Sequence, residues 1–150
     1  MGFRRDAREK AMQFLYQAEV NPGELEEQLA IFWAMQENEV ARNTRTFADE
    51  LIRGAARFVD ESDERIKKYS QNWDFHRIAH VDRNIMRLAI YELLHREDIP
   101  PVVTINEAVD IAKRFSTDDS GKFVNGILDR VKEELTRPFR TAAGGQDRKK

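Results

Sequence analysis

Residues 98–131 read DIPPVVTINEAVDIAKRFSTDDSGKFVNGILDRV, and this stretch determines the expected fold. Its paired prolines end the preceding element, because proline cannot continue a helical hydrogen-bond ladder. Thr104, followed three residues later by Glu107, is typical of a capping box at a helix start. Apolar residues recur at helical spacing on both sides of a polar turn at 116–120. This spacing predicts two helices, the second covering residues 119–135.

Helical spacing extends over the rest of the chain, and the alternating pattern of β-strands is missing. The further expected helices cover residues 4–20, 24–39, 44–69 and 82–96, with room for a short helix in 70–80. Asp82 is the predicted N-cap of the helix over 82–96. Apolar residues on most sides of this helix indicate a central position. We therefore expect one all-α domain over residues 1–140 and a disordered basic tail over 141–150.

Composition limits the class of protein. Hydrophobic residues make up 41% and charged residues 35% of the chain, which favours a folded, well-solvated protein over a disordered one. The chain has no cysteine, so disulfides, thiolate nucleophiles and cysteine metal sites are excluded. No apolar run approaches the roughly 20 residues of a membrane helix, and the charged start does not resemble a signal peptide. The expected location is the cytoplasm, without membrane contact.

Enzyme chemistry finds no support in the sequence. A glycine-rich phosphate loop and a nucleophile elbow are both missing. His76 and His80 have metal-ligand spacing but no indicated third ligand, so structural or surface histidines are the favoured interpretation. Glu92 is expected to pair with Arg96 one helical turn later. We expect no catalysis, no metal and no cofactor.

Charge is distributed unevenly, although the net charge is only -2. Residues 1–10 carry four basic against two acidic residues, and residues 130–150 carry seven against three. Residues 19–39 carry six glutamates and no lysine or arginine. Such asymmetry can build a basic patch on a nearly neutral protein, or it can reflect ordinary solvated helix faces.

The strongest physical indication of RNA binding is the cluster formed by Arg4, Arg5 and Arg8. Cations are unfavourable at a helix N-terminus, which already carries partial positive charge, unless an anion is bound there. Arg5 and Tyr16 lie about 20° apart on one helix face, so arginines could hold phosphate while the tyrosine stacks on a base. A Tyr16 that lies partly in the core remains the alternative.

Two further pairs extend this candidate surface. Arg83 and Arg87 are one turn apart on one helix face, where they could widen a basic surface or form ordinary salt bridges. Lys122 and Phe123 begin the last helix, and Phe123 falls off its apolar stripe. Its ring could cap the core or act as a stacking platform, and spacing alone leaves both open.

Residues 98–131 closely resemble the NusB family. The preceding stretch 81–94, VDRNIMRLAIYELL, is similar to the family's fourth-helix pattern, and residues 4–9 with 13–16 are similar to its arginine-rich start. Residues 24–80 match mainly in helical length and pattern. The long C-terminal motif makes the resemblance specific.

The resemblance implies an all-α fold of six to seven helices in two packed three-helix bundles. It implies a non-catalytic transcription antitermination factor that binds boxA RNA as a heterodimer with NusE, a small-subunit ribosomal protein. The pair would join RNA polymerase and other Nus factors. Some family members self-associate, so a homodimer of the free protein stays open.

Carried over by position, the resemblance implies two groups of site residues. The RNA-binding group comprises Arg4, Arg5, Arg8, Tyr16, Arg87, Lys122 and Phe123, to which the shared face adds Arg83. Asp118 and Asp119 match a loop–helix junction tied to RNA and NusE. Asp6 interrupts a run that is often more continuously basic, so we expect modest RNA affinity without the partner.

Two alternatives stay open. The same fold occurs as the RNA-binding domain of certain ribosomal RNA cytosine methyltransferases, although 150 residues leave no room for a methyltransferase domain. The other alternative is a helical protein-interaction module that binds no RNA and uses residues 24–39 with exposed apolar residues for a partner.

Overall fold

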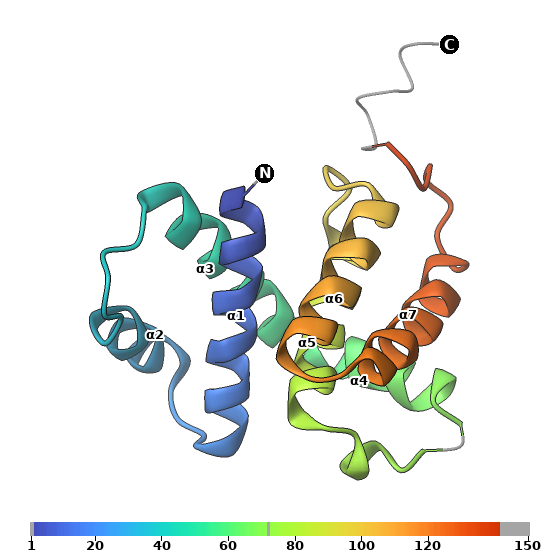
Figure 1. Ribbon diagram of the computed structural model, residues 1–150, viewed down its shortest axis with the longest axis horizontal. Helices are drawn as coiled ribbons and strands as arrows, with labels where there is room; N and C mark the ends of the chain where they lie inside the picture. Colours follow the sequence, from blue (N-terminus) through green and yellow to red (C-terminus); the bar gives the residue numbers. More distant parts are fainter. Residues whose placement is uncertain (1, 72, 142–150) are drawn as a thin grey trace.

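The computed structural model describes residues 2–71 and 73–141, and over these residues it is helical without any strand (Figure 1). The elements are α1 (Gly2–Val20), α2 (Leu25–Ala34), α3 (Arg42–Arg57), α4 (Val59–Tyr69), the 3₁₀ turn η1 (Phe75–Arg77), α5 (His80–His95), α6 (Pro101–Phe115) and α7 (Asp118–Lys132). The predicted all-α class is confirmed. The tail expected to be disordered lies, apart from Thr141, outside the described residues.

The helices form two groups that meet at α5. Helices α1, α2 and α3 make one bundle, and α5, α6 and α7 make the other, with α4 alongside (Figure 1). Helix α5 packs against α1, α3, α4, α6 and α7, and Met86, Ile90 and Leu93 on it are buried completely. The central position predicted from its apolar surface is therefore confirmed, and α5 fixes how the two bundles face each other.

The single helix expected over 44–69 is wrong, because α3 ends at Arg57 and α4 begins at Val59. Phe58 between them leaves helical geometry, with φ -108° and ψ 26°. Its ring stacks on His95 of α5 at a centroid distance of 3.9 Å. The backbone amides of Phe58 and Ser62 still bond four residues back, so the chain bends without losing its hydrogen bonds.

Two expected helix starts are corrected. Ala79 is the N-cap of α5, and Asp82 lies within the first turn with its side chain directed to Ser120 of α7. Helix α6 starts at Pro101 rather than at a capping box, since proline suits the first helical position. Thr104 lies inside α6, and its hydroxyl donates to Glu92 at 2.7 Å. Both polar side chains make tertiary bonds in place of local caps.

Two boundaries also differ. Helix α2 ends at Ala34, five residues before the predicted Glu39, and Glu24 caps its start by accepting from the amides of Glu26 and Glu27. Helix α7 ends at Lys132 rather than at Leu135.

Residues after α7 return to the end of α5. The guanidinium of Arg137 donates to the carbonyl oxygens of Leu93 at 2.8 Å and Ile99 at 2.9 Å. The last carbonyls of a helix have no partner within the helix, so a cation there satisfies them and complements the helix dipole. Arg137 thus caps α5 from far along the chain.

Candidate nucleic-acid interface

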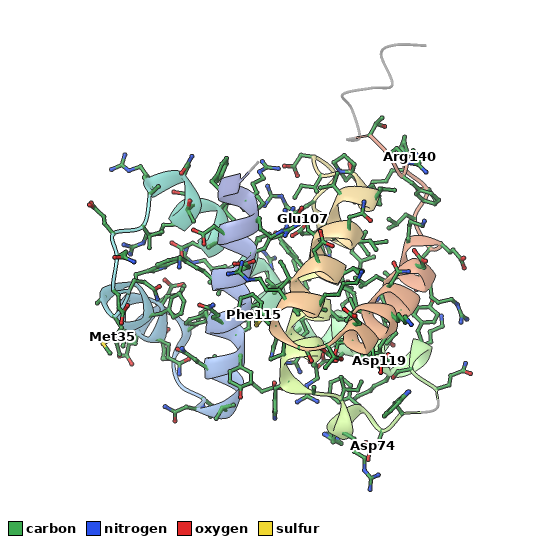
Figure 2. The ribbon with its side chains drawn as sticks, in the orientation of Figure 1. Met35, Asp74, Glu107, Phe115, Asp119 and Arg140 are labelled. Carbon is green, nitrogen blue, oxygen red and sulfur yellow. The ribbon has the colours of Figure 1, made fainter. Side chains whose placement is uncertain are left out.

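The arginine-rich start of α1 is held by carboxylates of the protein itself. The buried guanidinium of Arg8 donates to both carboxylate oxygens of Glu92, at 2.8 and 2.9 Å. Arg5 donates twice to Glu107, at 2.6 and 2.9 Å, and once to Asp110 at 3.0 Å. Figure 2 shows Glu107 between α1 and α6. The anions beside Arg5 and Arg8 are therefore carboxylates of the protein itself. The expected pairing of Glu92 with Arg96 is wrong, because Glu92 pairs with Arg8.

The same contacts shift the ionisation of the partners. The hydrogen bonds that Arg5 donates to Glu107 raise the pKa of Arg5 and lower the pKa of Glu107. Arg4 differs, since it makes no ion pair within the described chain and its guanidinium lies 4.5 Å from the centre of the Phe47 ring. Of the three predicted arginines, Arg4 is therefore the one without a carboxylate partner among the described residues.

Arg83 and Arg87 converge on Glu19 of α1 instead of spreading over the surface. Buried Arg83 bonds to Glu19 at 3.1 Å and to the carbonyl of Phe75 at 2.8 Å. Arg87 bonds to Glu19 at 3.0 Å and twice to Asp63, at 2.7 and 2.9 Å. These arginines join α1, α4 and α5, so any phosphate they held would have to displace internal carboxylates.

Glu19 is strongly stabilised as a carboxylate by these neighbours. Burial alone would raise its pKa, but hydrogen bonds from His80 and Asn84 and the charges of Arg87 and Arg83 lower the pKa to about 2. His80, considered from its spacing as a metal ligand, bonds Glu19 at 2.7 Å. No group of three or more His, Asp or Glu side chains in the described residues is placed to hold a metal ion.

Tyr16 lies exposed at the other end of α1. Eleven residues separate it from Arg5, which corresponds to about 16 Å along the helix. Its ring is 40% exposed and meets His80 edge-on at a centroid distance of 6.0 Å. The arginines and Tyr16, predicted to share one face of the helix, thus lie towards opposite ends of α1.

A cleft of about 280 Å³ lies where η1 and the N-termini of α5 and α7 come together. Trp73 is 60% exposed and meets Phe123 edge-on at a centroid distance of 5.9 Å. Figure 2 shows Asp119 at the start of α7, with Asp74 of the neighbouring segment below it. The lining residues are Trp73, Arg77, Ile78, Ala79, Asp82, Thr117, Asp119, Ser120 and Phe123.

Asp82 gives this cleft an unmet hydrogen-bonding capacity. Its carboxylate is buried, with Oδ2 accepting from the Ser120 hydroxyl at 2.9 Å and Oδ1 left without a partner in the described structure. Burial raises the pKa of Asp82 against the opposing effect of the Ser120 bond. A buried acceptor without a donor costs about 1–3 kcal/mol. Only a donor that reached the buried Oδ1 would recover that cost.

The first turn of α7 presents both signs of charge beside the cleft. Thr117 caps the helix by accepting from the Ser120 amide at 3.0 Å, and Asp118 and Asp119 follow in the first turn. Both aspartates and Lys122 are exposed, and Phe123 is half-buried. The structure thus brings together Asp119, Lys122 and Phe123 of the sequence-predicted residues.

Sequence reasoning missed part of this cleft. Trp73 lies in the stretch whose spacing was irregular, and Asp82 was interpreted only as a helix cap. An exposed tryptophan in an otherwise polar connection was the available signal, because large aromatics on a surface often mark binding sites. Arg77 carried no signal in the sequence, whereas Thr117 and Ser120 lie in the polar turn predicted over 116–120.

Fold and cleft together define the class: an all-helical protein of two bundles with an aromatic, carboxylate-lined cleft at one end. The family model described as the NusB family matches residues 5–133. The chain belongs to the NusB family. None of the described helices is both long enough and apolar enough to cross a membrane.

Proteins of similar sequence align with this chain over nearly its whole length. "Transcription antitermination protein NusB" of Thermodesulfovibrio yellowstonii is 45% identical, with 88% of this chain and 93% of that protein covered. The protein of the same name from Myxococcus xanthus is 44% identical, with 92% and 100% covered.

Solved structures show the same arrangement. NusB of T. maritima is 41% identical and superposes with a TM-score of 0.78 over 89% of this chain and 93% of that one. A chain from the crystal structure of antitermination factors NusB and NusE in complex with dsRNA is 26% identical, with a TM-score of 0.80 over 90% and 99%.

Proposed function

We propose that this protein is a cytoplasmic transcription antitermination factor that binds boxA-type single-stranded RNA together with NusE. Its relatives are named transcription antitermination proteins, and a structural neighbour is a complex of NusB and NusE with dsRNA. We further propose that the pair joins RNA polymerase and other Nus factors and so supports ribosomal RNA transcription.

The observation that carries the RNA-binding proposal is the cleft of Trp73, Phe123 and Asp82. An unpaired base can stack on an aromatic ring while its amino group donates to a carboxylate. Asp82 lines the cleft beside the two rings, and its buried Oδ1 has no partner in the described residues. Single-stranded RNA fits this arrangement better than a duplex, whose bases are already stacked and paired.

The other predicted site residues take two roles in this proposal. Arg4, which is half-buried, and the exposed Tyr16 and Lys122 are our candidates for further contacts with RNA and the partner. Arg5 can contribute only the part of its charge that Glu107 and Asp110 leave uncompensated. Arg8, Arg83 and Arg87 position helices, because burial and ion pairs occupy their guanidinium groups. Asp118 and Asp119 remain our candidates for partner contact.

The test is fluorescence anisotropy with labelled boxA-like and scrambled RNA, with and without NusE, over a salt series. Phe123→Ala is expected to weaken boxA binding about 10- to 100-fold, since stacking on one base contributes about 1–3 kcal/mol. Val103→Ala removes an exposed side chain of α6 outside the cleft and serves as the matched control. Affinity should also fall as salt rises.

Equal binding of scrambled RNA, or unchanged affinity in Phe123→Ala, would refute the proposed site. Absence of RNA binding even with NusE would favour the protein-interaction alternative. Sedimentation velocity on the free protein decides whether it self-associates, which we propose as a property of the partner-free state.

A further inference from the structure

Helix α2 exposes an apolar face that the bundle does not cover. Leu29, Phe32 and Trp33 on one side of the helix are buried against the core. Ile31 is 62% exposed, and Met35, which follows the helix, is 74% exposed. Figure 2 shows Met35 at the outer edge of the α1–α3 bundle. Surface aliphatic residues scattered singly need no explanation, but these two line one groove.

The groove runs between the second half of α1 and α2, with a volume of about 680 Å³. Its α1 wall comes from residues 14–21 and its α2 wall from residues 28–36. Each wall is two helical turns long, about 12 Å. Val20 is 60% exposed on the α1 side. The lining residues are Phe14, Tyr16, Gln17, Ala18, Val20, Asn21, Gln28, Ile31, Phe32, Met35 and Gln36.

The ends of this groove are negatively charged. Lys10 reaches the second end, where its ammonium group donates to Gln36 at 3.4 Å, but no lysine or arginine occurs from residue 11 to residue 41. Glu24 and Glu27 precede Gln28 and Ile31 by one turn of α2, and Glu37 and Glu39 follow the lining residue Gln36. All four are exposed and form no ion pair in the described part of the chain. The C-terminus of α2 adds partial negative charge at the second end.

We propose that this groove is a docking site for a cationic amphipathic helix of another protein. Apolar side chains at i, i+3 or i+4, and i+7 would fill the two-turn groove, as in other helix-in-groove complexes. Lysine or arginine residues at both ends of the segment would face the exposed glutamates. This surface differs from the RNA cleft, and the proposal stands independently of the proposed function.

Charge argues against RNA and against a second copy of the chain in this groove, and side-chain size argues against the chain's own tail. RNA would meet carboxylates instead of cations. A symmetric dimer through this face would set Glu27 and Glu37 of one copy against the same acidic rim of the second. The chain's own residues 142–150, AAGGQDRKK, are basic but offer no large apolar side chain for the groove.

The experiment uses two synthetic peptides of about 18 residues, long enough to be helical in isolation. One carries leucine on one face and lysine on the other, and its matched control carries glutamate in place of lysine. Binding to the full chain is measured by anisotropy, and its location by amide chemical-shift changes. We expect the lysine peptide to bind at least 10-fold more tightly than the glutamate peptide, with shifts at residues 14–21 and 28–36.

Variants separate groove binding from general attraction to acidic proteins. The double substitution Ile31→Gln with Met35→Gln is expected to weaken lysine-peptide binding at least 10-fold. Glu27→Gln with Glu37→Gln should weaken it several-fold and reduce its salt dependence. Val103→Gln, an exposed aliphatic position outside the groove, and Glu64→Gln, an exposed glutamate of α4, should leave it unchanged.

Three results would overturn the proposal. One is a centre of chemical-shift change outside the groove, and another is undiminished binding by the Ile31 and Met35 double variant. The third is a dimer of the free protein, seen by sedimentation velocity, that the same double variant abolishes. That outcome would assign the groove to a second copy of this chain.

Discussion

Helix α5 carries two buried carboxylates with opposite surroundings. Glu92 near its end receives two bonds from Arg8 and one from Thr104. Asp82 near its start receives one bond from Ser120 and keeps an oxygen without a partner. A fully satisfied buried ion network holds helices in register, whereas a partly satisfied one leaves capacity for a ligand. On this one helix, Glu92 therefore stabilises the fold, whereas Asp82 belongs to the candidate binding site.

The largest expected effect on stability comes from removing the ion-pair partner of Glu92. Arg8→Met leaves Glu92 buried without its counter-charge and should lower the free energy of unfolding by about 3–5 kcal/mol in urea denaturation. Adding Glu92→Met should recover most of this loss, since no buried charge then remains unpaired. Arg53→Met, which removes an exposed partner of Glu26, should cost less than about 1 kcal/mol. A similarly small loss in Arg8→Met would contradict our account of Glu92.

Glu19 provides an intermediate effect with a defined pH dependence. Its pKa of about 2 lies below the ordinary 4.5, so its stabilisation is present above pH 4.5 and is lost as the pH falls towards 2. Glu19→Gln should lower the free energy of unfolding by about 2 kcal/mol at pH 7, allowing for partial solvent screening. The difference from the parent should shrink in urea titrations at successively lower pH. A difference that is constant with pH would show that charge is not its cause.

The smallest effect is expected at Asp82, and its sign is opposite. Burial raises the pKa of Asp82 above 3.8, so the ionised carboxylate destabilises the fold once the pH rises through that raised pKa. Asp82→Asn should therefore raise the free energy of unfolding slightly at pH 7 and leave it unchanged below pH 3.8. Asp119→Asn, at an exposed position, should change it by less than about 0.5 kcal/mol. Destabilisation by Asp82→Asn at pH 7 would show that Oδ1 has a donor.

Helical spacing was sufficient for the fold because each helix buries a local stripe. Helical spacing indicated the central helix and a first helix that ends at residue 20. It could not show the bend at Phe58, since the apolar stripe continues past it and the ring that stacks on Phe58 belongs to α5. Thr104 likewise looked like a cap, but a tertiary bond to Glu92 takes its hydroxyl.

The candidate site was harder to predict because its decisive partners are distant in sequence. Arg5 and Glu107 are 102 residues apart, and Arg8 and Glu92 are 84 apart. One sequence without contacts cannot tell an arginine that awaits RNA from one that already has a carboxylate. Phe123 was identified because it leaves the stripe of α7, which is a local signal.

Arg137 has a consequence for the order in which the protein is made. The carbonyl of Leu93 that it caps is synthesised 44 residues earlier, which is about 2–9 s at the usual rate of translation. A nascent chain that ends before Arg137 therefore carries α5 with its last carbonyls open to water. The most central helix of the fold is completed among the last, so a truncated chain should lose protection from amide hydrogen exchange at the end of α5 before it does so elsewhere.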